Sequence, residues 1–504
     1  MDKSMVARQR RTDGRTEDLY LRKKRGPLLP WLMHLLASSS SIPMATTRAT
    51  STLLLLLLLV SATWAASAPT TSRARNVITH VKGFQGRLPF HLETGYVEVD
   101  NTNTVELFYY FIQSERSPAD DPLILWITGG PGCSALSGLL FEIGPLKFDV
   151  AGYTEGFPQL FYFQDSWTKV SNVIFLDAPV GTGFSYAREE QGYNVTLTQT
   201  GQQLVVFLTK WLGDHPEFAS NPLYIGGDSY SGYTVPVTAL QIANDDDARA
   251  RLNLKGYLVG NAATDVKYDS GGKVPFMHGM GLISDEMYEA ARSSCRGDYV
   301  STPTNADCAN ALQAISMATF AINPVHILEP ICGFALRGRA MPETTMDQRL
   351  RLGLPVECRD NGYRLSYLWA DDPEVRATLG IHEGSIASWS RCTALPLFRH
   401  DVDSAIPYHA ELTQRGYRAL VYNGDHDLDM TFVGTQQWIR TLGYNVVTAW
   451  RPWYSNRQVA GFTTVYDHNL TFATVKGGGH TAPEYRPKEC LDMLDRWTSP
   501  AGEL

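Results

Sequence analysis

The stretch that decides the fold is Leu223-Tyr224-Ile225-Gly226-Gly227-Asp228-Ser229-Tyr230-Ser231-Gly232. An apolar run breaks on two glycines, and a serine follows just before a segment that is compatible with a helix. A strand-to-helix turn this tight leaves no space for large neighbours, and the small residues Gly227 and Ser231 flank the serine at two positions on either side. The pattern predicts that Ser229 is a nucleophile on a strained turn. On this stretch alone, an ordinary glycine-rich turn is the alternative.

Apolar runs on both sides of this stretch predict further strands. Continuous runs, typical of strands that are buried on both faces, lie at 122–127, 172–176, 254–259, 418–423 and 470–475. Aromatic and β-branched residues at 95–99 and 107–111 predict an opening antiparallel hairpin. Apolar residues at helical spacing between Thr198 and Leu212 predict a helix between two strands. This alternation predicts an α/β fold with a mostly parallel central sheet.

A glycine cluster, Thr128-Gly129-Gly130-Pro131-Gly132-Cys133-Ser134, follows the first of these buried strands. Glycines at the end of a central strand allow backbone N–H groups to approach a ligand closely. The alternative for this cluster taken alone is a tight turn.

Two further candidates follow the last two strands. Asp427 comes shortly after the 418–423 strand, and His480 follows the 470–475 strand. The order Ser229, Asp427, His480 is the chain order of the catalytic triad in α/β-hydrolases, in which each member lies on a loop at the carboxyl end of a strand. An aspartate in a loop is usually a turn former, and a lone histidine is rarely a catalyst. Their joint placement predicts a triad.

The composition indicates a large globular protein. The chain has 504 residues, of which 44% are hydrophobic and 19% charged. The formal net charge of -8 and the lack of a basic stripe in the main body argue against general nucleic-acid binding.

The N-terminal region is predicted to contain a disordered extension and a signal peptide. Residues 1–43 are rich in Arg and Lys, and a secretory signal peptide is expected over 44–68, with cleavage after Ala66 or Ala68. Met44 is in the right place to start that signal, so translation from Met44 is our hypothesis for residues 1–43. N-terminal sequencing of a mature protein that retained Arg25 would contradict it. No later apolar stretch reaches about twenty residues, so no membrane anchor is expected.

All seven cysteines follow the predicted signal peptide, at Cys133, Cys295, Cys308, Cys332, Cys358, Cys392 and Cys490. In an oxidising compartment, three disulfides and one thiol are expected. Four of the cysteines lie where periodicity weakens, and we expect a disulfide-stapled cap at 265–395, inserted between core parts at 69–264 and 396–504. The sequons at Asn194 and Asn469 predict glycosylation on the secretory route.

Taken together, the motifs resemble the serine carboxypeptidase family from about residue 83 to residue 497. The segments that carry the resemblance are 126–134, 177–186, 227–232, 424–427 and 479–480. The resemblance implies an α/β-hydrolase fold in which Ser229 is the nucleophile, His480 the general acid and base, and Asp427 the residue that orients the histidine. It also implies that the N–H groups of Gly130 and Tyr230 form the oxyanion hole.

The family's pairing implies the disulfides Cys133–Cys392, Cys295–Cys308 and Cys332–Cys358, with Cys490 free. Thr128, Gly129 and Asp228 take the positions of substrate-binding residues. Two of these depart from the peptidases, which typically carry Asn in place of Thr128 and Glu in place of Asp228, and use both side chains to hold the carboxylate of a peptide. Threonine has no amide N–H to offer, and aspartate is one methylene shorter, so a buried carboxylate would lose partners.

These departures make the chain similar to the plant acyltransferase branch of the family. Members of that branch move acyl groups from glucose esters onto alcohols or amines, and they are typically vacuolar. We therefore expect an acyl-glucose donor and a small acceptor, no metal or organic cofactor, and a vacuolar or extracellular location. Peptide hydrolysis, with a peptide substrate, is the first alternative. A binding protein or a lyase that does not use the triad is the second. The oligomeric state is left open.

Overall fold

The computed structural model describes residues 75–331 and 359–499 except 101, 103 and 304, together with 502 and 504. These residues belong to one unit, Arg73–Leu504. The predicted extension 1–43, the predicted signal peptide 44–68, and the predicted partners Cys332 and Cys358 lie outside the described residues. Among the helices of the described part, none is long and apolar enough to cross a membrane.

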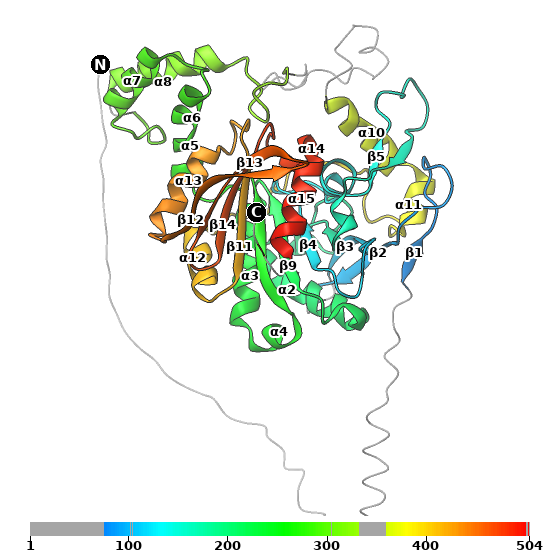
Figure 1. Ribbon diagram of the computed structural model, residues 1–504. Helices are drawn as coiled ribbons and strands as arrows, with labels where there is room; N and C mark the ends of the chain where they lie inside the picture. Colours follow the sequence, from blue (N-terminus) through cyan, green and yellow to red (C-terminus); the bar gives the residue numbers. More distant parts are fainter. Residues whose placement is uncertain are drawn as a thin grey trace, which may run out of the picture. The chain divides into compact units, whose positions relative to one another are not determined.

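A sheet of twelve strands runs through the centre of this unit (Figure 1). Its strands are β1 (Asn76–Ile78), β2 (Leu92–Glu98), β3 (Val105–Ile112), β4 (Leu123–Ile127), β7 (Asn172–Leu176), β8 (Tyr186–Ala187), β9 (Leu223–Asp228), β10 (Leu254–Gly260), β11 (Arg418–Gly424), β12 (Val446–Ser455), β13 (Gln458–Tyr466) and β14 (Leu470–Val475). The spatial order is β1-β2-β3-β7-β4-β9-β10-β11-β14-β13-β12, with β8 beside β3. Every neighbouring pair from β7 to β14 is parallel, and the pairs on either side are antiparallel. A separate hairpin pairs β5 (Leu146–Phe148) with β6 (Leu160–Tyr162).

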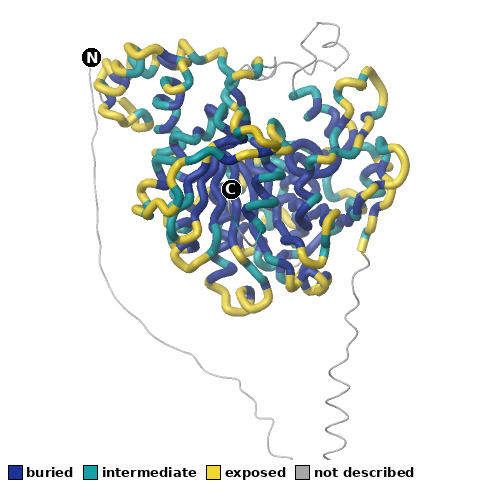
Figure 2. Tube along the Cα trace, viewed as in Figure 1, coloured by how far each residue is buried: buried dark blue, intermediate teal, exposed yellow. Residues whose placement is uncertain are grey.

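Helices cover both faces of the sheet. They are α2 (Leu197–Asp214), α3 (Ser231–Asn244), α4 (Asp246–Arg251), α5 (Val266–Gly271), α6 (Lys273–Gly279), α7 (Asp285–Cys295), α8 (Ala306–Thr319), α10 (Asp360–Ala370), α11 (Pro373–Leu379), α12 (Ile406–Gln414), α13 (Phe432–Thr441), α14 (Ala482–Tyr485) and α15 (Pro487–Thr498). Four short turns are η1 (Gly138–Glu142), η2 (Trp167–Lys169), η3 (Glu190–Tyr193) and η4 (Pro216–Phe218). Side chains of α2, α3, α12 and α13 pack in one apolar core, and those of η1, α10, α11 and α15 in a second. The strands between these cores are buried (Figure 2).

The strands that the sequence predicts are present, and the chain has the α/β-hydrolase type of fold. The predicted helix between Thr198 and Leu212 is also present as α2, which extends over Leu197–Asp214. Its first turn is closed by a capping box, in which Thr196 accepts from the Gln199 N–H and Gln199 accepts from the Thr196 N–H.

Short helices fill much of the long connection between β10 and β11, where the inserted cap is expected. Helices α6, α7 and α8 form a small apolar cluster that also includes Leu428, which follows β11, and the disulfide Cys295–Cys308 joins α7 to α8. Helices α10 and α11 differ, because Trp369 and Leu379 pack in the second of the two cores beside the sheet, which we call the main core. The connection therefore contains one part, α6 to α8, that forms a separate apolar cluster, and another part, α10 and α11, that completes the main core.

Residues 391–393 hold the glycine cluster that follows β4. Cys133 is bonded to Cys392, the Ser134 N–H donates to the Arg391 carbonyl at 2.7 Å, and the Thr393 N–H donates to the Gly132 carbonyl at 2.8 Å. The disulfide joins positions 259 residues apart, so it fixes a distant segment against the cluster.

Replacing both Cys133 and Cys392 by serine should slow the reaction of Ser229 with a fluorophosphonate probe. Loss of the disulfide costs about 2–5 kcal/mol of stability, and the cluster beside Ser229 also loses its anchor. The labelling rate and the melting temperature are to be measured together. The matched control replaces Cys295 and Cys308, which should lower stability without changing the labelling rate. Equal labelling rates in both variants would contradict the anchoring role.

Candidate active site

Ser229 lies on the turn between β9 and α3 in a strained conformation. Its φ of 52° is in the left-handed region that few residues other than glycine adopt. The Ser229 N–H donates to the Gly260 carbonyl at 3.0 Å, and the Ala263 N–H donates to the Ser229 carbonyl at 2.9 Å. A Cβ on Gly129 would lie 2.6 Å from the Ser229 Cβ, so this position requires glycine. The expected strained turn is therefore present.

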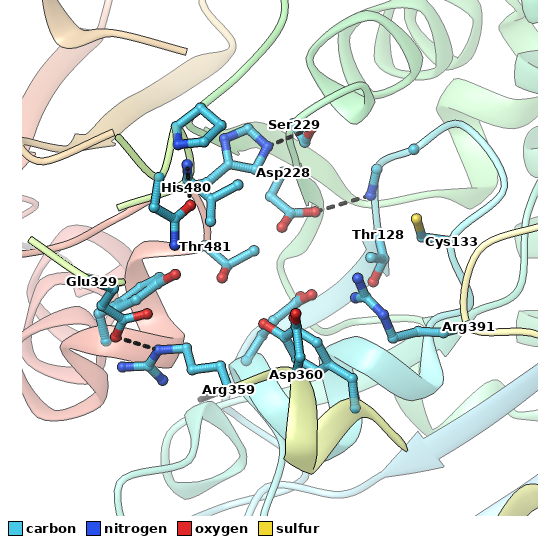
Figure 3. Close-up of a pocket in the computed structure, with 18 of the residues that line it drawn as sticks. Thr128, Cys133, Asp228, Ser229, Glu329, Arg359, Asp360, Arg391, His480 and Thr481 are labelled. Carbon is cyan, nitrogen blue, oxygen red and sulfur yellow. Dashed lines mark hydrogen bonds and ion pairs between the residues drawn. The ribbon is translucent and has the colours of Figure 1, made fainter. Parts of the chain in front are cut away.

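The structure brings Ser229, His480 and Asp427 together from the ends of β9, β14 and β11. His480 Nε2 lies 2.8 Å from Ser229 Oγ (Figure 3). His480 Nδ1 lies 2.9 Å from Asp427 Oδ2. The Asp427 side chain is fully buried. With the proton on Nδ1 held by Asp427, Nε2 can accept the proton of Ser229, which is the geometry of nucleophile activation.

The charges around His480 favour its protonated form. Burial opposes the imidazolium charge, but the charge and hydrogen bond of Asp427, and then the charges of Asp429 and Asp228, raise the pKa of His480 to about 9. Burial raises the pKa of Asp228 to about 6. Protonation of Asp228 below that pH removes one charge that stabilises the imidazolium, so the pKa of His480 falls as the medium becomes acidic.

Asn261 is a site residue that the sequence analysis did not identify. It follows β10, is fully buried, and has a φ of 45°. Its Nδ2 donates to Asp427 Oδ2 at 2.8 Å, and the Gly424 N–H donates to its Oδ1 at 3.2 Å. Asn261 therefore fixes the carboxylate oxygen that faces His480.

The proposed oxyanion donors are the N–H groups of Tyr230, the residue after Ser229, and of Gly130, which lines the same cavity as Ser229. Gly129 packs closely against the peptide bond between Ser229 and Tyr230. A Cβ added to Gly129 would lie only 2.8 Å from the Tyr230 nitrogen. Within the described residues, neither the Gly130 N–H nor the Tyr230 N–H has a hydrogen-bond acceptor. Both N–H groups are thus available to a developing oxyanion.

Thr128 and Asp228 face the same cavity as Ser229, together with a carboxyl group, Glu142, that was not predicted. Asp228 Oδ1 accepts from the Gly129 N–H at 3.0 Å, and Glu142 Oε2 accepts from Trp126 Nε1 at 3.0 Å. Burial, and then the nearby charge of Asp228, raise the pKa of Glu142 well above its usual value. The buried Thr128 Oγ1 has no hydrogen-bond partner among the described residues.

The cavity has a volume of about 350 Å³, within the range of small-molecule sites. Figure 3 shows Arg391 beside Thr128 on one side, and the ion pair of Arg359 with Glu329 on another. The Arg391 guanidinium lies 4.2 Å from the centroid of the Tyr363 ring. In the described part of the chain, no group of three or more His, Cys, Asp and Glu side chains is placed to hold a metal ion.

Some of these residues leave a signal in the sequence. Glu142 interrupts the apolar run Leu139-Leu140-Phe141, and a carboxylate in such a run is a candidate for a functional buried charge. Asn261 comes shortly after a predicted buried strand, as Asp427 does. A polar residue at the end of such a strand is a candidate site residue, so the sequence also contains a signal for Asn261. Arg391 leaves no comparable signal, because a cation beside a cysteine is common in loops.

Cys133 lines the cavity, whereas the predicted glycosylation sites and Cys490 do not. Asn194 and Asn469 are exposed, as a glycosylated residue must be. Cys490 is buried and carries a free thiol.

Replacing Asn261 by glycine, which tolerates the positive φ, should lower kcat about 10-fold to 100-fold, because a buried hydrogen bond to a charge is worth about 1.5–3 kcal/mol. KM should change little. Without the amide, Asp427 attracts the imidazolium more strongly, so the acid limb of the pH profile should move to higher pH. The control is Asn221→Gly, because the buried Asn221 amide donates to the carbonyls of Pro118 and Asp121, away from the triad. An unshifted profile would leave Asn261 with a structural role only.

Comparison with known proteins places this site in a family. Residues 83–500 match the serine carboxypeptidase family. The chain is 44% identical to serine carboxypeptidase-like 2 and 45% identical to serine carboxypeptidase-like 4, both from Arabidopsis thaliana, over 84% of this chain and 92% of each relative. The crystal structure of Kex1Δp, a prohormone-processing carboxypeptidase from Saccharomyces cerevisiae, shares the fold with a TM-score of 0.65 and 20% identity, over 86% of this chain and 95% of that one. The chain therefore belongs to the serine carboxypeptidase family.

Proposed function

We propose that this protein transfers an acyl group from an acyl-glucose ester to an alcohol or amine through an acyl-serine intermediate on Ser229. The observation that carries the proposal is the chemistry around Thr128 and Asp228. The cavity presents a hydroxyl and two carboxyl groups where a peptide carboxylate would need several N–H donors. Sugar hydroxyls are neutral and can donate to carboxylates, so this set of groups suits a sugar better than an anion.

In the first half of the proposed reaction, Ser229 Oγ attacks the carbonyl carbon of the donor while His480 Nε2 takes the serine proton. The N–H groups of Gly130 and Tyr230 stabilise the oxyanion. His480 then gives the proton to the glucose oxygen, the ester bond breaks, and the acyl group remains on Ser229. Asp427 stabilises the imidazolium and keeps it oriented.

In the second half, the acceptor takes the place of glucose. His480 removes the proton of the acceptor, whose oxygen or nitrogen attacks the acyl-serine, and the proton returns to Ser229 as the bond to Oγ breaks. Transfer requires that the acceptor reacts faster than water. A bound and oriented acceptor has an effective concentration that can reach about 10⁵ M, which is enough to outcompete water.

Removal of C-terminal residues from peptides is the second candidate, and one observation favours it. The raised pKa values of Asp228 and Glu142 keep these carboxyl groups partly protonated in acid, and a protonated carboxyl can donate to a peptide carboxylate. Arg391 adds a cation to the same cavity. A screen of acyl-glucose donors with alcohol and amine acceptors, run beside a blocked dipeptide, distinguishes the two candidates.

The double variant Thr128→Asn with Asp228→Glu should raise peptidase activity and lower acyl transfer. Asparagine supplies an amide N–H for a carboxylate, and the longer glutamate fills space that a sugar or acceptor hydroxyl needs. The measurement is the ratio of transfer to dipeptide cleavage between about pH 4 and pH 7, a range that covers carboxyl and histidine titration. Ser229→Ala is the control and should abolish both activities, by a factor on the order of 10⁶. Efficient dipeptide cleavage by the wild type, without use of acyl-glucose, would refute the transferase assignment.

We further propose a location on the secretory route, in the vacuole or outside the cell. The two disulfides and the exposed sequons support an oxidising route of synthesis. Buried carboxyl groups with raised pKa values suit an acidic compartment. Burial raises the pKa of Asp177 and of Asp228 to about 6, and that of Asp269 to about 7.

The protein should be more stable at pH 5 than at pH 7.5. A carboxyl whose pKa is raised in the folded state keeps its proton at a pH at which the same carboxyl in the unfolded chain has lost it. The free energy of unfolding therefore decreases as the pH rises from about 4, the unfolded value, to about 7, the highest folded value. The raised pKa of His480 also makes the folded protein less stable as the pH rises, up to about pH 9. The buried His409, whose pKa is lowered to about 3, has the opposite effect on stability, but only below about pH 6.5. The melting temperature should fall by several degrees between the two pH values.

The variant Asp269→Asn tests this pH dependence. Asp269 Oδ2 accepts from the N–H groups of Thr264 and Asp265, and an amide oxygen can take over both bonds. The variant should therefore show a weaker dependence of the melting temperature on pH. Asp246→Asn, at a side chain that is 89% exposed, should leave it unchanged. A wild-type melting temperature that rises towards pH 7.5 would contradict the argument.

A further inference from the structure

A second cavity, which we call the rear cavity, lies against the wall of the active-site cavity. It has a volume of about 460 Å³, and its lining includes Leu140, Phe141, Lys147, Phe148 and Val150. Glu329 and Arg359 line both cavities. The two cavities therefore adjoin at these two side chains, which we call the wall.

The charged groups of this wall satisfy one another. Arg359 Nε donates to Glu329 Oε1 at 2.8 Å, and Arg359 Nη1 lies 3.5 Å from Glu484 Oε1. Glu484 also accepts from Tyr363 Oη at 2.8 Å and from Thr481 Oγ1 at 2.9 Å. These carboxylates therefore have hydrogen-bond or ion-pair partners within the protein, and no bound cation is required to neutralise them.

Lys147 is different, because it lines the rear cavity without an ion-pair partner among the described residues. Within the described residues, no carboxylate lies within 4 Å of its Nζ, which donates to the Phe141 carbonyl at 3.3 Å and lies 4.1 Å from the centroid of the Phe163 ring. An ammonium group has three N–H donors, so two of them have no acceptor in this part of the chain. Burial lowers the pKa of Lys147, as expected for a cation that is poorly compensated.

The rest of the lining is mainly apolar. Leu140, Phe141 and Phe148 are buried residues of the main core, and Val150 packs against them. Besides the interacting side chains of Arg359, Glu329 and Glu484, the cavity has apolar walls and one cation without an ion-pair partner. Small-molecule sites combine apolar contacts, which provide area, with a polar group that fixes orientation. A ligand anion would supply the partner that Lys147 lacks.

We propose that the rear cavity is a binding site for a small amphipathic anion, with its acidic group on Lys147 and its apolar part against Phe141 and Phe148. The site is distinct from the reacting centre, since it lies on the other side of the wall formed by Arg359 and Glu329. The proposal does not depend on whether Ser229 serves acyl transfer or peptide hydrolysis.

The test uses the full chain with Ser229 blocked by phenylmethanesulfonyl fluoride, so that the active-site cavity is occupied. Calorimetric titration compares 3-phenylpropanoate with 3-phenylpropanamide, which has the same shape and no charge. The carboxylate should bind at least 10-fold more tightly than the amide. Lys147→Met should remove that difference by weakening the carboxylate at least 10-fold while leaving the amide within 2-fold.

Arg391→Met is the matched control, because Arg391 lines the active-site cavity and not the rear cavity. It should leave both affinities unchanged in the blocked protein. Val150→Trp, which fills the rear cavity from its half-buried rim, should abolish binding of both compounds, and it tests the site if Lys147→Met does not fold. The proposal is wrong if Lys147→Met leaves the carboxylate affinity within 2-fold, if Arg391→Met removes it instead, or if binding survives Val150→Trp.

Discussion

The end of β10 holds the two halves of the candidate site in register. The Gly260 carbonyl accepts from the Ser229 N–H, and so helps to fix the strained turn on which the serine lies. The next residue, Asn261, donates its own N–H to the Tyr422 carbonyl at 2.7 Å and its amide to Asp427. One corner of the sheet therefore positions both the nucleophile and the carboxylate that orients His480. Its precision comes from parallel pairing of β9, β10 and β11, which brings the carboxyl ends of these strands to one edge.

The central strands were predictable from the sequence because burial on both faces requires nearly continuous apolar runs. The hairpin of β12 and β13 was not predicted. Its exposed face carries the apolar residues Val447 and Trp450, so it lacks the polar and apolar alternation that indicates a strand with one solvent face. The packing of α10 and α11 in the main core could not be predicted from the sequence either. It depends on contacts between residues more than two hundred positions apart, such as Trp369 with Phe148.

For the site, the sequence identified the residues that follow strands and turns with a fixed local geometry. Ser229, His480, Asp427 and the glycine cluster all have this property. Glu142 and Arg391 were missed because their role comes from what surrounds them: neither lies at the end of a strand, and both enter the cavity from other loops or turns. Local patterns thus predict residues that lie at strand ends, including Thr128 and Asp228, whereas cavity residues that come from other segments depend on long-range packing.

The buried acids couple the charge of the cavity to the protonation of His480. Ionised Asp228 raises the pKa of His480. A carboxylate in the cavity would be repelled by ionised Asp228, whereas a hydroxyl could donate to it. Protonated Asp228 has the opposite effects, because it can donate to a carboxylate and it leaves His480 more easily neutral. Acid also protonates His480, whose pKa of about 9 lies above that of Asp228, so the loss of the Asp228 charge does not by itself return the base to its neutral form. The Gly129 N–H donates to Asp228 Oδ1 at 3.0 Å and thereby opposes the rise that burial causes in the pKa of Asp228, so backbone geometry and burial together set the charge that His480 faces.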